Sequence, residues 1–170
     1  LYSLETYTPA SDFDIFGLTL QYELGYTNVL ALLDLAGIPV LQKERTIEPI
    51  VLGGGPCSTN PEPMADYFDA FVIGDGEAVT PVVCKAVKEN IDLLISGRRG
   101  ELLGILSEIE GVYVPSLGKK EVVKAVISDL SSYEIDGKPI VPYMKTVHDR
   151  AVMEVMRGCN RGCRDRKSVV

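Results

Sequence analysis

Two cysteines near the end of the sequence form the pattern with the clearest chemical meaning. Cys159 and Cys163 have three residues between them and follow the apolar segment 151–156, which we expect to form a strand. Thiolates on one loop can share a metal centre, and they are standard ligands of iron–sulfur clusters and of zinc. Arginines on both sides favour the thiolate form. We interpret the pair as metal ligands, although the spacing by itself is also compatible with two incidental thiols.

Two glycine-rich loops follow consecutive predicted strands, 49–52 and 70–73. Ligands in parallel α/β sheets bind beyond the carboxyl ends of strands, and glycine lets the backbone approach a ligand closely. Tight strand-to-helix turns would explain the same glycines, so both interpretations stay open. Neither loop has the spacing of a phosphate-binding motif. The candidate cofactor-binding residues are Gly53, Gly54, Gly55, Pro56, Gly74, Asp75, Gly76 and Glu77.

The elements around these loops alternate between strand and helix patterns, which is typical of an α/β fold. We expect a flavodoxin-like or Rossmann-like parallel sheet with helices on both faces. The expected strands are 14–20, 49–52 and 70–73, and the expected helices are 26–36, 62–68, 78–96 and 101–109. Cys84 falls inside the third helix, where we expect it to be buried.

The pattern changes after Ser96. Residues 97–100 are predicted to form a polar break, and 112–115 with 121–127 to form a hairpin. Residues 128–142 are rich in Ser, Asp, Gly and Pro and are typical of a linker. His148, the only histidine, lies just before the last predicted strand, where we expect a tethering role.

Composition excludes several classes of function. The 170 residues carry a net charge of −7, which argues against a nucleic-acid-binding surface. No apolar run approaches the roughly 20 residues that a membrane helix requires. Four cysteines are too few for a disulfide-stabilised secreted domain, so we expect a cytoplasmic protein.

The combined motifs carry a family resemblance. Cys159-x-x-x-Cys163 resembles the start of the C-x-x-x-C-x-x-C motif of radical S-adenosylmethionine (radical SAM) enzymes. The chain over roughly residues 1–164 is similar to an uncharacterised bacterial radical SAM family with an N-terminal cobalamin-binding-like domain. The segments that carry this resemblance are 11–14, 21–24, 33–39, 54–57, 60–63, 71–77 and 148–150.

The resemblance implies a domain plan for an N-terminal fragment. Residues 1–97 would form the cobalamin-binding-like α/β domain, without its beginning, and 98–147 a helix, hairpin and linker. Residues 148–164 would start the radical SAM domain, and we expect 165–170 to be a non-native tail because they depart from the family.

The resemblance also implies a function. The parent enzyme would use a [4Fe-4S] cluster to cleave S-adenosylmethionine reductively, on an unknown substrate, with Cys159 and Cys163 as the first two cluster ligands. The third ligand would fall at Arg166, which stays protonated and cannot bind iron, so we expect this fragment to be inactive.

Cobalamin is a candidate second cofactor by the same resemblance. The motif that would supply its lower histidine ligand is absent, and residues 1–147 contain no histidine. The partners that the resemblance implies are small-molecule cofactors. The charge and the lack of a long apolar run indicate neither a nucleic acid nor a membrane as a partner. The alternative is a non-catalytic α/β binding or positioning module with no bound cofactor.

Overall fold

A computed structural model of the chain describes residues 1–118, 121–130, 145, 147, 154 and 156–158. The chain divides into two compact units, Leu1–Ile127 and Ser128–Val170, and each is described by itself. The first unit takes in residues beyond 97, because elements after that position share its core.

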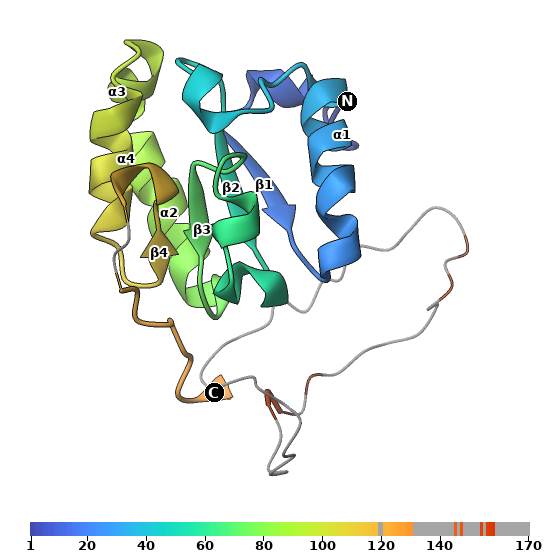
Figure 1. Cartoon of the computed structure of the whole chain (residues 1–170), viewed down its shortest axis with the longest axis vertical. Helices are drawn as coiled ribbons and strands as arrows, with labels where there is room; N and C mark the ends of the chain where they lie inside the picture. The colour runs from blue at the N-terminus through green and yellow to red at the C-terminus, as the bar shows by residue number, and fades with distance from the viewer. Residues whose placement is uncertain (119–120, 131–144, 146, 148–153, 155, 159–170) are drawn as a thin grey trace. The chain divides into compact units, whose positions relative to one another are not determined.

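A four-stranded sheet with the order β1-β2-β3-β4 forms the centre of the first unit (Figure 1). The strands β1, β2 and β3 are parallel to one another, and β4 is antiparallel to β3. An antiparallel edge strand on an otherwise parallel sheet is common. The strands are β1 (Ile15–Thr19), β2 (Ile50–Gly54), β3 (Ala70–Val72) and β4 (Val112–Tyr113).

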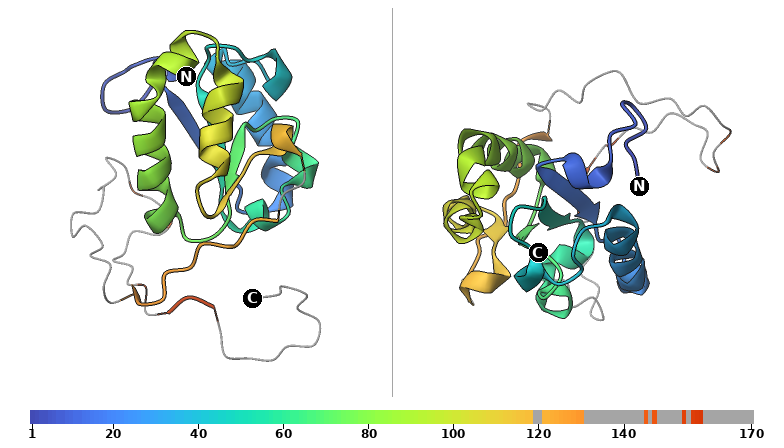
Figure 2. Two further views of the ribbon diagram at one scale, coloured as in Figure 1. Left: turned by 90° about the vertical axis from the view of Figure 1, so that its left-hand side faces the viewer. Right: turned by 90° about the horizontal axis from the view of Figure 1, so that it is seen from above.

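Helices cover both faces of this sheet (Figures 1 and 2). α1 packs on one face, while α2 and α4 pack on the other. This arrangement confirms the predicted α/β class. The α-helices are α1 (Tyr26–Ala36), α2 (Gly76–Glu89), α3 (Ile91–Ile95) and α4 (Arg99–Ser107). Short 3-10 turns are η1 (Ala10–Asp12), η2 (Glu23–Gly25), η3 (Gln42–Glu44), η4 (Pro56–Thr59), η5 (Glu62–Met64) and η6 (Pro115–Leu117).

Alternation along the strands divides the core into two clusters. On β2, Ile50 and Leu52 pack with α2 and α4, whereas Val51 between them packs with α1. Successive side chains of a strand point to opposite faces, so a strand covered on both sides is apolar at every position. This explains why the β2 segment is a continuous apolar run.

Two of the predicted helices differ from the observed elements. The expected helix 62–68 is only the 3-10 turn η5, with backbone hydrogen bonds that join each residue to the third before it. The expected helix 78–96 is divided into α2 and α3 at Asn90, whose Nδ2 donates to the carbonyl of Ala86 at 2.9 Å. An asparagine side chain that bonds the backbone competes with helix continuation.

The predicted hairpin of 112–115 with 121–127 is wrong. β4 pairs with β3 instead, and Ala125 forms an isolated parallel bridge with Gly74. The Ala125 N–H donates to the Ile73 carbonyl at 3.0 Å. The backbone groups of Ile73 and Asp75, which follow β3, form hydrogen bonds with Ala125. The segment that contains Ala125 therefore pairs with the chain after β3 and does not fold back on β4.

Cys84 is exposed, which corrects the prediction that it is buried. The buried residues of α2 are Val79, Val83 and Val87, at intervals of four. Cys84 is one position further along the helix than Val83, which turns it about 100° away from the buried stripe.

The second unit is described at few positions. Within it, Arg157 Nε lies 2.7 Å from Glu154 Oε1 in an ion pair. His148, Cys159, Cys163 and most of the predicted strand 151–156 lie outside the described residues.

Candidate functional site

The two glycine-rich loops lie at the same edge of the sheet. Gly53 and Gly54 end β2, and Pro56 begins η4 directly after Gly55. Gly74 and Asp75 follow β3, and Gly76 with Glu77 open α2. Because β2 and β3 are adjacent and parallel, both loops leave the sheet at its carboxyl edge. The two glycine-rich loops predicted from the sequence therefore do follow neighbouring strands and lie at one edge of the sheet.

The first loop is closely packed by this chain's own aromatic rings. A Cβ on Gly53 would lie 2.6 Å from Phe71 Cδ1 and 3.0 Å from Phe68 Cδ1. The hydroxyl of Ser58, which is buried, lies 2.6 Å from the carbonyl of Gly55 and 2.9 Å from that of Val72. The absence of a side chain at Gly53 thus makes room for a phenylalanine from β3.

The second loop is covered by the segment that follows β4. Gly74 has φ +118°, and a Cβ there would collide with the carbonyl oxygen of Ala125. The Asp75 N–H donates to the same carbonyl at 2.9 Å, and the Ile127 N–H donates to Asp75 Oδ2 at 2.8 Å. Here too, the glycine accommodates this chain's own backbone.

A cavity of about 360 Å³ lies beside these loops. Its apolar walls are Pro61, Ile73 and Val122, and its polar groups come from Thr59, Glu62, Tyr113 and Glu121. Ile73 comes directly after β3, so the cavity is also at the carboxyl edge.

Tyr113 and Glu62 are the interacting pair of this cavity. The Tyr113 hydroxyl donates to Glu62 Oε1 at 3.0 Å. Burial raises the pKa of Tyr113 above its ordinary value, and the hydrogen bond and negative charge of Glu62 raise it further. The phenol therefore stays neutral and keeps its proton directed to Glu62.

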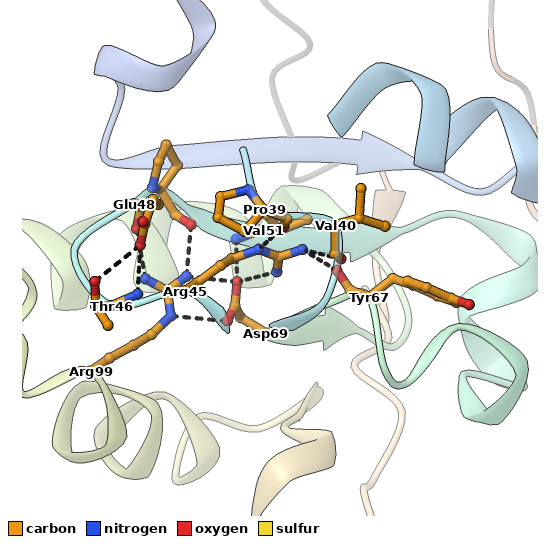
Figure 3. Close-up of polar contacts among 10 residues, drawn as sticks. Pro39, Val40, Arg45, Thr46, Glu48, Val51, Tyr67, Asp69 and Arg99 are labelled. Carbon is orange, nitrogen blue, oxygen red and sulfur yellow. Dashed lines mark hydrogen bonds and ion pairs between the residues drawn. The ribbon is translucent and has the colours of Figure 1, made fainter. Parts of the chain in front are cut away.

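The opposite, amino edge of the sheet holds a buried network of charges (Figure 3). Asp69, which is 0% exposed, lies directly before β3, and Arg45 and Arg99 contact it from two other parts of the chain. Arg45 Nη1 is 2.9 Å and Arg99 Nη2 is 2.8 Å from Asp69 Oδ2. The N–H of Val51 also donates to Oδ2, at 2.7 Å.

Backbone carbonyls satisfy the remaining guanidinium donors. Arg45 donates to the carbonyls of Pro39, Val40 and Tyr67, and Arg99 to those of Glu48 and Pro49. Burial lowers the pKa of Arg45, and Asp69 acts in the opposite direction. No buried side-chain nitrogen or oxygen in the described part of the chain lacks a hydrogen-bond partner. Fully satisfied buried charges at this edge indicate a structural role.

Sequence reasoning missed both the network and the cavity. Residues 97–100 were expected to form a polar break, yet Arg99 is buried at the start of α4. Asp69 is a charged residue inside the otherwise apolar run 68–73, and this pattern could have indicated a buried, paired charge. Glu62 and Tyr113 are 51 positions apart, and no local pattern connects them.

Metal ligands are not brought together in the described residues, which contain no group of three or more His, Cys, Asp or Glu side chains able to hold a metal ion. Cys57 is partly buried and Cys84 is exposed.

Within the described residues, no helix combines the length and apolar character that a membrane crossing needs.

The fold and its carboxyl edge define an α/β domain of the open-sheet type. A family model described as "Radical SAM proteins, N-terminal" matches residues 1–115. The chain therefore belongs to the family of radical SAM protein N-terminal regions.

A curated relative supports the same relationship. The chain is 32% identical over 170 residues to the uncharacterised protein MJ0966 of Methanocaldococcus jannaschii. That match covers 96% of this chain and 32% of the relative, so the chain spans about a third of its length. No solved structure matches the chain significantly.

Proposed function

We propose that the chain is the N-terminal region of a radical SAM enzyme, in which Cys159 and Cys163 are the first two ligands of a [4Fe-4S] cluster. The family match over residues 1–115 carries this proposal, and the Cys-x-x-x-Cys spacing follows downstream of the matched region. When bound, the cluster supplies the electron that cleaves S-adenosylmethionine.

The donor set fits such a cluster only in part. Two thiolates are present, but the third position of the motif is Arg166. A guanidinium stays protonated and offers no lone pair to iron. This chain therefore lacks the third ligand, and we expect it to be inactive in its present form.

Restoring the third thiol is the sharpest test of this proposal. The chain and its Arg166→Cys variant are reconstituted anaerobically with iron and sulfide, and iron and labile sulfide are counted after desalting. We expect about four irons per chain in the variant and much less in the original chain. S-adenosylmethionine should then change the electron paramagnetic resonance spectrum of the reduced variant, because one iron is open.

Cys159→Ser in the Arg166→Cys background is the matched control and should lose the iron. The proposal fails if Arg166→Cys holds no more iron than this control. It also fails if the original chain binds a stable cluster and cleaves S-adenosylmethionine, because Arg166 would then not be the defect.

The second candidate is a positioning module with no bound cofactor, and the packing of the two loops favours it over a cobalamin-binding domain. Phe71 takes up the space at Gly53, and Ala125 takes up the space at Gly74. The sequence 1–147 also provides no histidine as a lower ligand. These residues do not fit a corrinoid. Hydroxocobalamin added to the same preparation and retained through desalting would contradict this.

A further inference from the structure

The outer side of β1, which faces away from β2, is at the end of the strand order (Figure 1). The carbonyl of Asp14 and the N–H of Leu20, which flank the strand, both form hydrogen bonds with β2. Backbone groups of successive strand residues point alternately to the two sides of the strand. The even-numbered residues therefore bond to β2, and the N–H and C=O groups of Ile15, Gly17 and Thr19 point to the outer side.

These outward backbone groups can accept another strand. Within the part of the chain that the structure describes, no hydrogen bond joins the backbone of Ile15, Gly17 or Thr19 to a group outside β1 and β2. Gly17 and Thr19 are exposed. The strand reads Ile-Phe-Gly-Leu-Thr and contains neither a charged residue nor a proline, the residues that commonly prevent an edge strand from pairing with another chain.

The sequence of β1 is self-complementary for antiparallel pairing about Gly17. In this register Gly17 lies opposite Gly17 of a second copy, and Ile15 lies opposite Thr19. Each of these pairs exchanges two hydrogen bonds, so all the outward backbone groups of both copies are used. On the α1 face Phe16 lies opposite Leu18, and both are only partly buried in the single chain. Pairing therefore also covers apolar surface.

Neither side chains nor charges oppose this register. An added Cβ on Gly17 would meet nothing within 4 Å, so the position is open in the single chain. Glycine on both sides of the centre lets the two backbones approach each other. Asp14, the charged residue next to the strand, lies opposite Leu20 of the second copy, so like charges do not face each other directly across the pair.

We propose that the outer side of β1 is a self-association surface. Two copies of this chain pair β1 with β1 in antiparallel orientation about a two-fold axis at Gly17, and their sheets become continuous. A two-fold interface uses the same surface on both copies, as this symmetric register does. Each copy contributes one short strand, so we expect a weak dimer that depends on concentration. The pairing does not involve the cluster cysteines and can fail or succeed independently of the proposed enzyme function.

Analytical ultracentrifugation and amide hydrogen exchange of the full chain test the proposal. A reductant is present, because Cys84 is exposed and could form a disulfide between copies. We expect the dimer fraction to rise with concentration. Exchange at Gly17 and Thr19 should become slower as the dimer forms, because their N–H groups gain partners. Exchange at Phe16 and Leu18, which already bond to β2, should respond much less.

Substitutions at Gly17 test the register. Gly17→Lys and Gly17→Glu each fit the single chain, but each places two like charges opposite one another and should raise the Kd of the dimer about fivefold. An equimolar mixture of the two variants places Lys opposite Glu and should restore the Kd of the original chain. Gly100→Lys, at an open and exposed position of α4, is the matched control and should leave the Kd unchanged.

Three results would overturn the proposal. The first is a chain that stays monomeric up to its solubility limit. The second is a dimer that is equally stable in the Gly17→Lys and Gly100→Lys chains, because it would then form through another surface. The third is a mixture of Gly17→Lys and Gly17→Glu that associates no better than either variant, because β1 would then not face a second β1. The exchange pattern of the original chain tests the surface even if a variant disturbs folding.

Discussion

The two edges of the sheet use polar residues in opposite ways. At the amino edge, Asp69 is completely buried between Arg45 and Arg99. At the carboxyl edge, Glu62 and Glu121 are exposed beside the cavity that Tyr113 also lines. Buried charge must be paired to be tolerated, whereas exposed acceptors can remain available for a ligand. Asp69 therefore depends on its two arginines, whereas solvent can satisfy the exposed carboxylates of Glu62 and Glu121.

Removing the buried carboxylate should have the largest effect. Asp69→Ala leaves two guanidinium groups buried without a counter-charge, and we expect a loss of about 3–5 kcal/mol in the free energy of unfolding. Urea denaturation measures it. Asp66→Ala, at an exposed position in the same loop, should change stability by less than about 0.5 kcal/mol. Equal effects of both substitutions would contradict the role of the buried carboxylate in holding this edge together.

A side chain at Gly74 should have the next largest effect, this time at the carboxyl edge. Gly74→Ala combines a positive φ with a collision against Ala125, and we expect a loss of about 2 kcal/mol in the free energy of unfolding. Hydrogen exchange at the amides of Asp75 and Ala125 should become faster. Gly54→Ala is the control, because nothing lies within 4 Å of its Cβ position. Unchanged exchange would mean that the 121–127 segment does not depend on this contact.

The smallest expected effect is on the ionisation of Tyr113. Its pKa is raised above the ordinary value of 10.0 by burial and by Glu62, so Glu62→Gln should lower that pKa while burial keeps it elevated. The pKa of Tyr113 is higher in the folded than in the unfolded chain. The neutral phenol therefore contributes fully to the free energy of unfolding below about pH 10, and this contribution is lost as the pH rises through the pKa of the folded state.

Carbon NMR of the Tyr113 ring, assigned with Tyr113→Phe, measures this pKa. Glu121→Gln is the control, since Glu121 is not among the groups that shift Tyr113. A pKa that responds equally to both substitutions would contradict the specific hydrogen bond between Tyr113 and Glu62.

Local patterns in the sequence were sufficient for several elements. The helix expected at 26–36 is α1 with the same bounds, because its apolar spacing is regular and Gly37 ends it with φ +70°. The parallel strands were predicted as short apolar runs, and two of them, 49–52 and 70–73, lead directly into glycine-rich loops. The prediction of two glycine loops at one edge depends only on these adjacent, parallel strands.

Other features depend on residues that are distant in the sequence. Arg99 is buried because Asp69, 30 positions away, accepts its hydrogen bonds. The segment 121–127 resembles a hairpin strand by its alternation, but its partner is the end of β3. In both cases the local pattern was compatible with two outcomes, and a distant partner decided between them.

From the amino acids alone, the three parallel strands, helix α1, the α/β class and the cysteine spacing could be derived, since each depends on neighbours within a few residues. Only the folded chain decided that Gly53 and Gly74 make room for Phe71 and Ala125, and that Glu62 meets Tyr113. Such contacts form between segments that are distant in the sequence and compete for the same space and the same hydrogen-bonding groups. No pattern of neighbouring residues determines which of these segments makes the contact.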